Sequence, residues 1–400
     1  MAKWRKVKLA DVCKFVRGPF GGSLKKDIFV SQGYAVFEQQ HAIYGDFNMF
    51  RYFVTKDKFN EMQRFKLSPG DLIMSCSGTL GKVALVPEGI PHGIINQALL
   101  KLTPTGEVEG SYIKSWFESD LFTQSLRQNS GGAAIQNVAE VRLLKEIEIP
   151  LPPLAEQRKI AEILRTWDEA IETAEAELKA KQELLKRAVA KYFEKAYRDA
   201  TSGKVGKLKT LDAVCTRKGE YGAAVSACPY NPEWPRYIRI TDITETGILK
   251  KERAVSISPE SAEGYSLKMG DLLFARTGEP GRCLIFNEAY LAAFAGYLIR
   301  FKARPEVTLP EYVYFYTLSS VYDKWVGDVS QKGAQANINA KVYGSLQLPV
   351  TDLNSQEAAV RVFKALQESV LLAEQGAELL RTQKRGLMQK LLTGEVRVAA

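Results

Sequence analysis

A short glycine loop at residues 78–82 is the stretch whose residue types come nearest to phosphate chemistry. It reads Gly78-Thr-Leu-Gly81-Lys82, and glycine backbone amides beside a lysine can cradle phosphate groups. A P-loop needs four residues between its glycines and a serine or threonine after the lysine. A second copy of the loop, at residues 278–282, ends in Arg282 instead of lysine. We therefore interpret both loops as turns between strands, not as nucleotide sites.

The other chemically competent residues form no catalytic or metal-binding set. Pro229-Tyr-Asn-Pro232 has the composition of an amino-methyltransferase motif in the wrong order, and no glycine-rich cofactor loop accompanies it. The two histidines, His41 and His92, lie near no plausible nucleophile or metal cluster, and the five cysteines have no metal-ligand spacing. Cys13 and Cys215 fall at equivalent places in the two halves, which predicts matched buried positions. We expect no metal, no cofactor and no catalytic activity in this chain.

Composition and charge describe the partners that the chain can take. The 400 residues are 46% hydrophobic and 25% charged, as in ordinary globular proteins, and suggest two or three domains. No apolar run reaches membrane-spanning length and no signal-peptide block is present, so we expect a cytoplasmic protein without membrane contact. Of the net charge of +9, residues 1–150 and 201–350 each carry +4, whereas residues 151–200 are neutral. This equal basic excess on two segments favours a polyanionic partner.

A long helix is predicted to organise these segments. After Leu151-Pro-Pro153, neither proline nor glycine appears until Gly203. Apolar residues recur in steps of four and three, which is the seam of a coiled coil, and only Lys181 interrupts them. A helix from Leu154 to Arg198 would be roughly 65 Å long. The seam consists of Ile160, Leu164, Trp167, Ile171, Leu178 and Leu185, among others.

The same seam returns 199 residues later, so the partner helix lies in the same chain. Its main members are Phe363, Leu366, Val370, Leu380, Leu387 and Leu391, and Lys384 is its one interruption. The lead-in recurs too, because Gln157 matches Gln356 and Ile149-Pro150 matches Leu348-Pro349. If the two ends of the intervening unit lie close together, the second helix must run back along the first. We therefore expect an antiparallel two-helix coiled coil.

The globular segments repeat one plan as well. Leu67, Gly70 and Asp71 match Leu267, Gly270 and Asp271, and Asn137 matches Asn337. Short strands and a helical pattern at residues 111–127 indicate a mixed α/β (α+β) domain. Between the matched landmarks the halves differ freely, so that residues 42–66 have little counterpart in 243–265. One scaffold with two different sets of loops is typical of two domains that recognise different targets.

The chain resembles the specificity subunits of type I restriction–modification enzymes over nearly its whole length. The marks are Ile149-Pro-Leu-Pro-Pro-Leu-Ala-Glu-Gln157 before the long helix, the Gly-Asp-Leu and glycine-loop pair in both halves, and the closing Lys384-Arg-Gly-Leu-Met-Gln-Lys-Leu-Leu-Thr-Gly394. One departure is Asp352-Leu-Asn-Ser-Gln356, which lacks the Pro-Pro pair and the glutamate before glutamine and could weaken or merely vary a second docking surface. The resemblance implies target-recognition domains at 1–150 and 204–350 and spacer helices at 151–203 and 351–400, related by an approximate two-fold axis.

The resemblance also implies what the chain does. As a non-catalytic DNA-specificity subunit, it would recognise a bipartite, asymmetric site on double-stranded DNA, one half with each domain. Two modification (methyltransferase) subunits would dock on the helices, and restriction (motor) subunits would join them. S-adenosylmethionine, ATP and magnesium would belong to those partner subunits. From the residues alone, two alternatives stay open: a coiled-coil scaffold with protein partners only, and a self-sufficient methyltransferase or nuclease, which the missing motifs disfavour.

Candidate DNA contacts are basic and amide or hydroxyl side chains on predicted loops, because these groups bind phosphates and base edges. In the first domain they are Arg17, Lys25, Lys26, Gln39, Gln40, His41, Ser77 and Thr79. In the second domain they are Arg217, Lys218, Arg239, Thr241, Arg276, Thr277, Gln331, Lys332 and Gln335. For each of them, the competing interpretation is a solvated surface residue.

Overall fold

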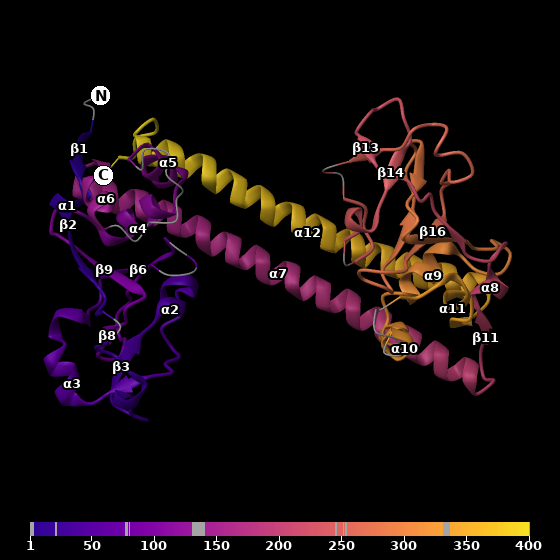
Figure 1. The fold of residues 1–400 in the computed structure, drawn as a ribbon, viewed down its shortest axis with the longest axis horizontal. Coiled ribbons are helices and arrows are strands. Elements are labelled where there is room, and N and C mark those ends of the chain that lie inside the picture. Colours follow the sequence, from indigo (N-terminus) through magenta and orange to yellow (C-terminus); the bar gives the residue numbers. More distant parts are fainter. Residues whose placement is uncertain are drawn as a thin grey trace. The chain divides into compact units, whose positions relative to one another are not determined.

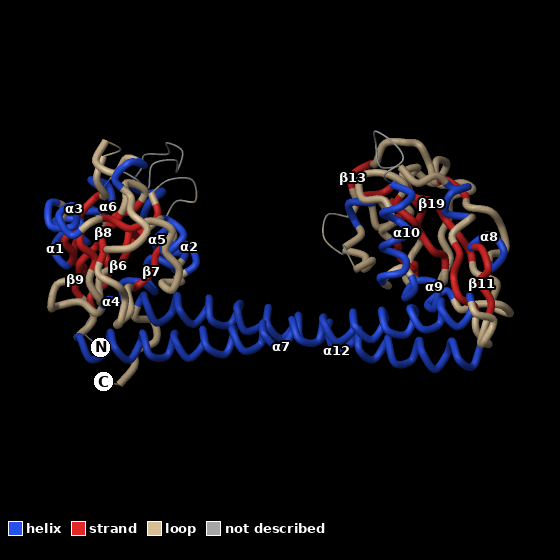
Figure 2. The backbone as a smooth tube through the Cα atoms, turned by 90° about the horizontal axis from the view of Figure 1, so that it is seen from below, coloured by secondary structure: helices blue, strands red, loops and turns tan. Residues whose placement is uncertain are grey.

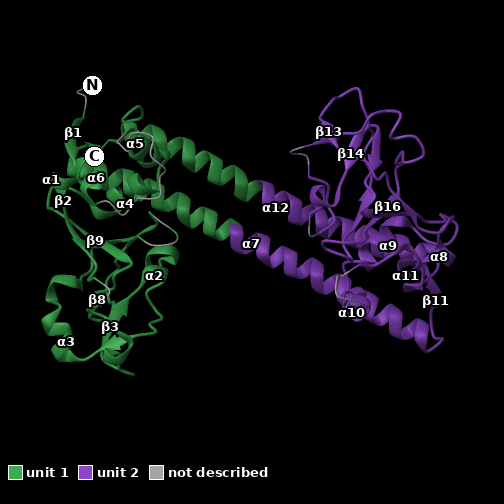
Figure 3. Cartoon of the chain, in the orientation of Figure 1, with its two compact units in different colours: residues 1–174, 376–400 green, residues 175–375 purple. Residues whose placement is uncertain are grey.

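The structure, a computed structural model, describes residues 4–20, 22–76, 79, 81–129, 141–244, 246–250, 252, 254–330 and 337–399. The chain forms two compact units, residues 1–174 with 376–400 and residues 175–375 (Figure 3). Each unit combines a globular part with segments of the two long helices, α7 (Leu154–Thr201) and α12 (Leu353–Thr393). The domain bounds at 150, 203 and 350, which follow chain order, stay a prediction.

The first unit is a mixed α/β fold of short strands and helices (Figure 1). Its strands are β1 (Arg5–Lys8), β2 (Cys13–Arg17), β3 (Tyr34–Phe37), β4 (Phe53–Val54), β5 (Lys66–Leu67), β6 (Leu72–Ser75), β7 (Val83–Leu85), β8 (Gly93–Ile95), β9 (Leu99–Pro104) and β10 (Glu148–Leu151). Its helices before α7 are α1 (Leu9–Val12), η1 (Lys26–Ile28), α2 (Gln39–Tyr44), α3 (Lys56–Glu61), η2 (Gln63–Phe65), α4 (Gly110–Glu118), α5 (Asp120–Asn129) and α6 (Val141–Glu146). The helical pattern predicted at 111–127 is thus two helices, which meet at the buried Ser119.

The second unit follows the same order. Its strands are β11 (Lys207–Thr210), β12 (Glu220–Tyr221), β13 (Cys228–Pro229), β14 (Arg236–Ile238), β15 (Val255–Ser256), β16 (Asp271–Ala275), β17 (Cys283–Phe286), β18 (Ala292–Phe294), β19 (Leu298–Lys302) and β20 (Gln347–Val350). Its helices between α7 and α12 are α8 (Leu211–Val214), η4 (Ile240–Asp242), α9 (Pro310–Tyr316), α10 (Ser320–Ser330) and α11 (Ala340–Gly344).

The sheets of the two units match strand for strand at their centres. The order β2-β9-β6-β7 of the first unit corresponds to β12-β19-β16-β17 of the second, and the pair β1-β10 corresponds to β11-β20. A second four-stranded sheet contains a parallel pair in each unit, β3 with β8 and β14 with β18. The strands of these sheets are the red segments of Figure 2. The repeat that the sequence predicts is therefore also present in the strand order of the sheets.

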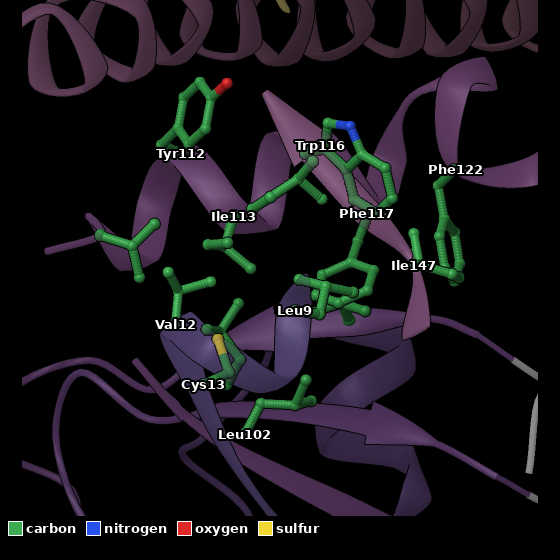
Figure 4. Close-up of a cluster of buried hydrophobic side chains, with 14 of the residues drawn as sticks. Leu9, Val12, Cys13, Leu102, Tyr112, Ile113, Trp116, Phe117, Phe122 and Ile147 are labelled. Atoms are coloured by element: carbon green, nitrogen blue, oxygen red, sulfur yellow. The ribbon is translucent and has the colours of Figure 1, made fainter. Parts of the chain in front are cut away.

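The main core of the first unit lies between the β2-β9-β6-β7 sheet and helices α4 to α6. Trp116, Phe117 and Phe122 pack edge to face there, beside Leu9, Val12 and Ile147 (Figure 4). The second unit has the corresponding core, in which Tyr312, Tyr316 and Tyr343 are completely or almost completely buried. Cys13 and Cys215 occupy matched buried positions, as predicted, and burial raises the pKa of each thiol to about 12. Both thiols therefore stay neutral and serve as small packing groups.

Within each unit the segments of α7 and α12 run antiparallel. In the first unit Asp168 binds Lys384 of α12. Glu156, earlier in α7, binds Arg397, which follows the end of α12, so the two helices run in opposite directions. In the second unit Phe193 packs against Phe363. Ile160, Leu164, Phe363 and Leu391 of the seam are buried, and the other seam residues named above are half-buried. By contrast, Leu184 and Leu379, which lie off the seam, are 55% and 57% exposed.

Candidate nucleic-acid interface

The two units place different side chains on one backbone framework at the ends of the parallel strands. Strand β3 runs into Glu38 and helix α2, and strand β14 runs into Arg239 and η4. In both units the carbonyl of the last strand residue accepts a hydrogen bond from the segment after the partner strand: Asn96 N to Phe37 O at 3.0 Å and Ala295 N to Ile238 O at 2.9 Å. The segments that follow Phe37 and Ile238 are therefore structurally equivalent.

His41 is held inside this framework and does not lie on the surface, so it leaves the set of candidate contacts. Its Nδ1 accepts a hydrogen bond from the Glu38 amide at 2.9 Å, and its Nε2 lies 3.1 Å from the Met49 carbonyl oxygen. The ring stacks on Phe50 and is completely buried. Asp242 has the same role in the second unit, because its carboxylate accepts from the Arg239 amide at 2.9 Å. The sequence could not separate this capping role from a contact with DNA.

The glycine loops that resemble phosphate loops are hairpin turns, as expected. Each joins two antiparallel strands, β6 to β7 and β16 to β17. Asp71 and Asp271 hold the preceding turn, since each carboxylate accepts a backbone N–H, from Ser68 and from Lys268, at 2.9 Å. Gly81 has φ of 76° and the equivalent Gly281 has φ of 98°, conformations that favour glycine. Each loop thus follows a hydrogen-bonded turn and ends at a glycine with positive φ.

In the first unit the hairpin meets the start of α2. The Gln39 side chain donates a hydrogen bond from Nε2 to the Thr79 carbonyl oxygen at 3.4 Å. Gln40 is half-buried beside it and Thr79 is exposed. The structure therefore brings together three of the candidates, two amides and a threonine, at one edge. Ser77 lies outside the described residues.

In the second unit the hairpin carries an arginine that neighbouring groups hold in place. The Arg276 guanidinium carbon lies 5.0 Å from the centre of the Tyr221 ring, and its Nε lies 3.4 Å from Asn337 Oδ1. Thr277 follows it and is half-buried, and Ile240 of η4 lies against the same hairpin at Gly278. Arg276 and Thr241 therefore lie at the places that Cys76 and Gln40 have in the first unit.

Two other candidate arginines of this unit are already paired. Arg239 binds the Asp242 carboxylate with two nitrogens, at 3.1 and 2.9 Å, and these bonds raise the pKa of its guanidinium above the usual range. Arg217 lies 3.3 Å from Glu220 on the surface. The Arg239 pair is part-buried, because Asp242 is buried, so it holds Arg239 in place. The Arg217 pair is exposed and contributes little to stability, so its guanidinium can exchange Glu220 for a phosphate.

The remaining candidates fall into two groups. Lys25, Lys26 and Lys218 are exposed, and Arg17, at the end of β2, is half-buried. Gln331, Lys332 and Gln335 lie outside the described residues. Tyr221 and Asn337 are not among the sequence-based candidates, although the repeat pairs Asn337 with Asn137. Both act on Arg276, so their role became visible only with the fold.

The described residues contain no group of three or more His, Cys, Asp or Glu side chains that could hold a metal ion. No helix in the described part of the chain combines the length and the apolar character that a membrane span needs. What the arrangement can do is bind: it presents amide, hydroxyl and guanidinium donors from two equivalent but differently equipped edges.

Comparisons with known proteins match this arrangement. Residues 1–182 match the family described as "Type I restriction modification DNA specificity domain". The chain is 23% identical over 429 residues to the putative type I restriction enzyme MjaX specificity subunit of Methanocaldococcus jannaschii, covering 99% of this chain and 94% of the relative. It is 24% identical over 319 residues to the EcoBI specificity subunit of Escherichia coli, covering 73% of this chain and 66% of the relative.

Solved structures show the same fold. A chain from a study of complex assembly and conformational transition of the type I R-M system has a TM-score of 0.61 at 17% identity, covering 98% of each chain. The S subunit from M. genitalium has a TM-score of 0.57 at 14% identity, covering 98% of this chain and 96% of the other. The fold likeness thus extends over both halves, beyond the matched N-terminal residues.

Proposed function

The chain belongs to the specificity subunits of type I restriction–modification systems, and on that premise we propose that its two units read the two halves of one bipartite, asymmetric DNA site. The observation that carries the proposal is the pair of equivalent edges. Phe37 and Ile238 accept corresponding backbone hydrogen bonds, whereas the side chains presented after them are Gln39 and Gln40 in one unit and Arg239 and Thr241 in the other. Matched backbone segments that carry different hydrogen-bond donors favour two half-sites of different sequence.

The chain serves as the DNA-reading part of a larger complex. The chemistry comes from partner subunits: two modification subunits, which bind S-adenosylmethionine and methylate adenine, and restriction subunits, which use ATP and magnesium. Support for this division comes from the relatives described above, which are named as specificity subunits of type I restriction enzymes. The helices α7 and α12 provide long exposed faces outside their seam, on which such subunits can dock.

The test is a methylation map. The chain would be co-expressed with a modification subunit, and the modified bases of the host DNA would be sequenced. We expect one gapped motif whose two halves differ. A complex that assembles and methylates at no defined sequence would contradict the proposal and favour a scaffold with protein partners only. Binding of the complex to DNA should also weaken steeply with salt, because phosphate contacts release counterions.

A further inference from the structure

Arg17 and Tyr221 occupy the same place in the two units. Arg17 is paired with Leu100 across β2 and β9, and Tyr221 is paired with Ile299 across β12 and β19. The next residue is a glycine in both units. Gly18 N donates to Leu99 O at 2.8 Å, and Gly222 N donates to Leu298 O at 3.3 Å. Because the register and the following glycine agree, the two side chains leave the sheet at equivalent points.

Cys76 and Arg276 form a second equivalent pair, on the far side of β9 and β19 from Arg17 and Tyr221. Each follows the last residue of the central strand, β6 or β16. The Cys76 amide donates to the Ala98 carbonyl at 2.8 Å, and the Arg276 amide donates to the Tyr297 carbonyl at 3.0 Å. Met74 and Phe274, two residues earlier, face the positions Leu100 and Ile299. Cys76 and Arg276 therefore point to the same side of the sheet as Arg17 and Tyr221.

Each unit thus has one arginine in this two-residue place, supplied by opposite strands. In the second unit Arg276 stacks on Tyr221 at 5.0 Å. In the first unit Arg17 lies close enough to Cys76 for its positive charge to act on that thiol, whose pKa burial raises and the guanidinium lowers in part. The arginine is thus on β2 in the first unit and directly after β16 in the second, but it lies at the same end of the sheet in both.

An unsatisfied donor on the Arg17 guanidinium supports a ligand at this place. Its Nη1 is buried and has no hydrogen-bond partner among the described residues. An unsatisfied buried donor is rare and costs free energy, which an acceptor arriving from outside would recover. Arg276 is prepared in a different way, since Tyr221 and Asn337 restrict its side chain but leave its two terminal nitrogens without an acceptor among the described residues. The Arg17 guanidinium thus lacks an acceptor, and the Arg276 guanidinium is positioned to bind one.

We propose that the arginine at this place, Arg17 in the first unit and Arg276 in the second, reads a guanine in its own half-site. The inference rests on the proposed function and names the residues that set its specificity. A guanidinium fork matches the O6 and N7 acceptors of guanine, and this pairing is the commonest specific contact between proteins and DNA. A restricted side chain suits that role because the fork must meet two acceptors in one plane. Exposed, freely moving lysines such as Lys25 suit phosphate contact instead.

The test uses the full chain in complex with its modification subunit and compares Arg17→Ala with Lys14→Ala, an exposed basic residue on the same strand. Arg17→Ala should remove the guanine preference at one position of one half-site, by roughly 5- to 150-fold in relative methylation rate. The other half-site should stay unchanged, as should the whole motif of Lys14→Ala. Arg276→Ala should do the same to the opposite half-site. Arg17→Met, which keeps the apolar stem, replaces Arg17→Ala if the alanine variant melts early.

A transplant gives the sharpest outcome. The double variant Arg17→Tyr with Cys76→Arg moves the arginine to the strand that carries it in the second unit, and should recover the guanine preference that Arg17→Tyr alone loses. An unchanged motif in Arg17→Ala would overturn the proposal. So would an equal loss on all sequences with a shallower salt dependence, because that is the signature of a phosphate contact. If the wild-type complex methylates no gapped motif, the proposed function fails first, and the two failures are distinguishable.

Discussion

Gln157 and Gln356, which are 199 positions apart, are both completely buried and share three corresponding hydrogen bonds, to which Gln356 adds one from the Thr308 hydroxyl at 3.0 Å. Each Oε1 accepts a backbone N–H from the loop before α4 or α9, from Glu109 at 2.8 Å and from Leu309 at 3.0 Å. Each Nε2 donates to two carbonyls, at 3.1 and 2.9 Å in the first unit and at 3.1 and 2.8 Å in the second. One side chain thus fixes the start of each long helix to its globular unit.

Replacing Gln157 by leucine should therefore cost about 3 kcal/mol, since a buried amide N–H and two carbonyls lose their partners at once. The variant should melt at a lower temperature in the full chain. Gln182→Leu is the matched control, because Gln182 is exposed on the same helix. Equal melting temperatures for Gln157→Leu and the wild type would show that the glutamine does not fix the helix.

Next to this glutamine, Glu156 holds the C-terminal segment of the chain. Its carboxylate accepts from Arg397 at 2.7 and 2.8 Å and from the Trp4 indole at 3.1 Å, and it is buried. The hydrogen bond from Arg397 holds the pKa of Glu156 below its usual range. A lowered pKa means that this carboxylate stabilises the fold above the unfolded value of roughly 4.3, and that the contribution is lost as pH falls through the folded value.

Arg397→Met should remove that contribution and destabilise the first unit by about 3 kcal/mol at neutral pH, because it leaves a buried carboxylate without its cation. Melting temperatures would be measured from pH 7 to pH 3. The wild type should lose more stability than the variant below pH 4.5, so that the two curves converge on acidification. Arg385→Met, at an exposed site of α12, should run parallel to the wild type. Parallel curves for Arg397→Met would rule out the role of the pair.

The helix seam gives a comparison within one helix. Leu164 is 1% exposed and belongs to the core of the first unit, whereas Leu184 is 55% exposed. Leu164→Asp should cost about 4 kcal/mol or more, because it removes a packed side chain and buries a charge. Leu184→Asp should change the free energy of unfolding by less than about 0.5 kcal/mol, as surface substitutions usually do. Chemical denaturation of the two variants would decide whether the predicted face is the packed one.

Modular reading can be tested by exchanging a whole unit. Residues 204–350 would be replaced by the equivalent unit of a related specificity subunit, and the methylated motif would be mapped. One half of the motif should change and the other should stay, since the donors that differ between units lie on their own edges. A motif altered in both halves would mean that the units read jointly.

The repeat and the seam could be predicted from sequence because both depend on spacing, which the chain order preserves. Asp71 and Asp271, which the repeat matches, make the same local bond, since each carboxylate accepts a backbone N–H at 2.9 Å. Partners across the fold could not be predicted. The departure at Asp352 to Gln356 reads as a lost glutamate, yet Ser355 bonds Asp352 at the helix start, with its amide at 2.9 Å and its hydroxyl at 2.6 Å, while the glutamate of the first copy binds Arg397, 241 positions away.

The candidate contacts show the same division. Residue type on a predicted loop singles out Gln39 and Thr79, and the fold brings the Gln39 amide within 3.4 Å of the Thr79 carbonyl oxygen. His41 was chosen for the same reason, and the fold buries it as a capping group. Residue type marks which groups can bind a base or a phosphate, but burial decides which of them are free to do so.

A fragment of residues 1–204 tests the helix pairing most directly. It would keep the first globular part and α7 but lose residues 376–400, and with them Met388, Leu391 and Leu392 of the core. An exposed stripe of this size does not persist in water. The nearest substitute is α7 of a second copy, because the seams are related by the 199-residue repeat. We expect an isologous dimer with antiparallel helices, which methylates a palindromic motif made of one half-site twice.

Lys181 and Lys384, the two lysines in the seams, predict the stability of the fragment dimer. In the full chain Lys384 binds Asp168, and its side chain is only 16% exposed. The repeat places Leu185 of a second copy where Lys384 was and Lys181 where Leu380 was, so the ion pair is lost and a charge enters an apolar position. The fragment dimer should therefore be weaker than the intact pairing. Leu185→Lys should tighten it by restoring a cation opposite Asp168, and Lys181→Leu should tighten it further. A monomeric fragment that still methylates the asymmetric motif would exclude both the helix pairing and the assignment of one reader to each half-site; sedimentation and methylation mapping would distinguish these outcomes.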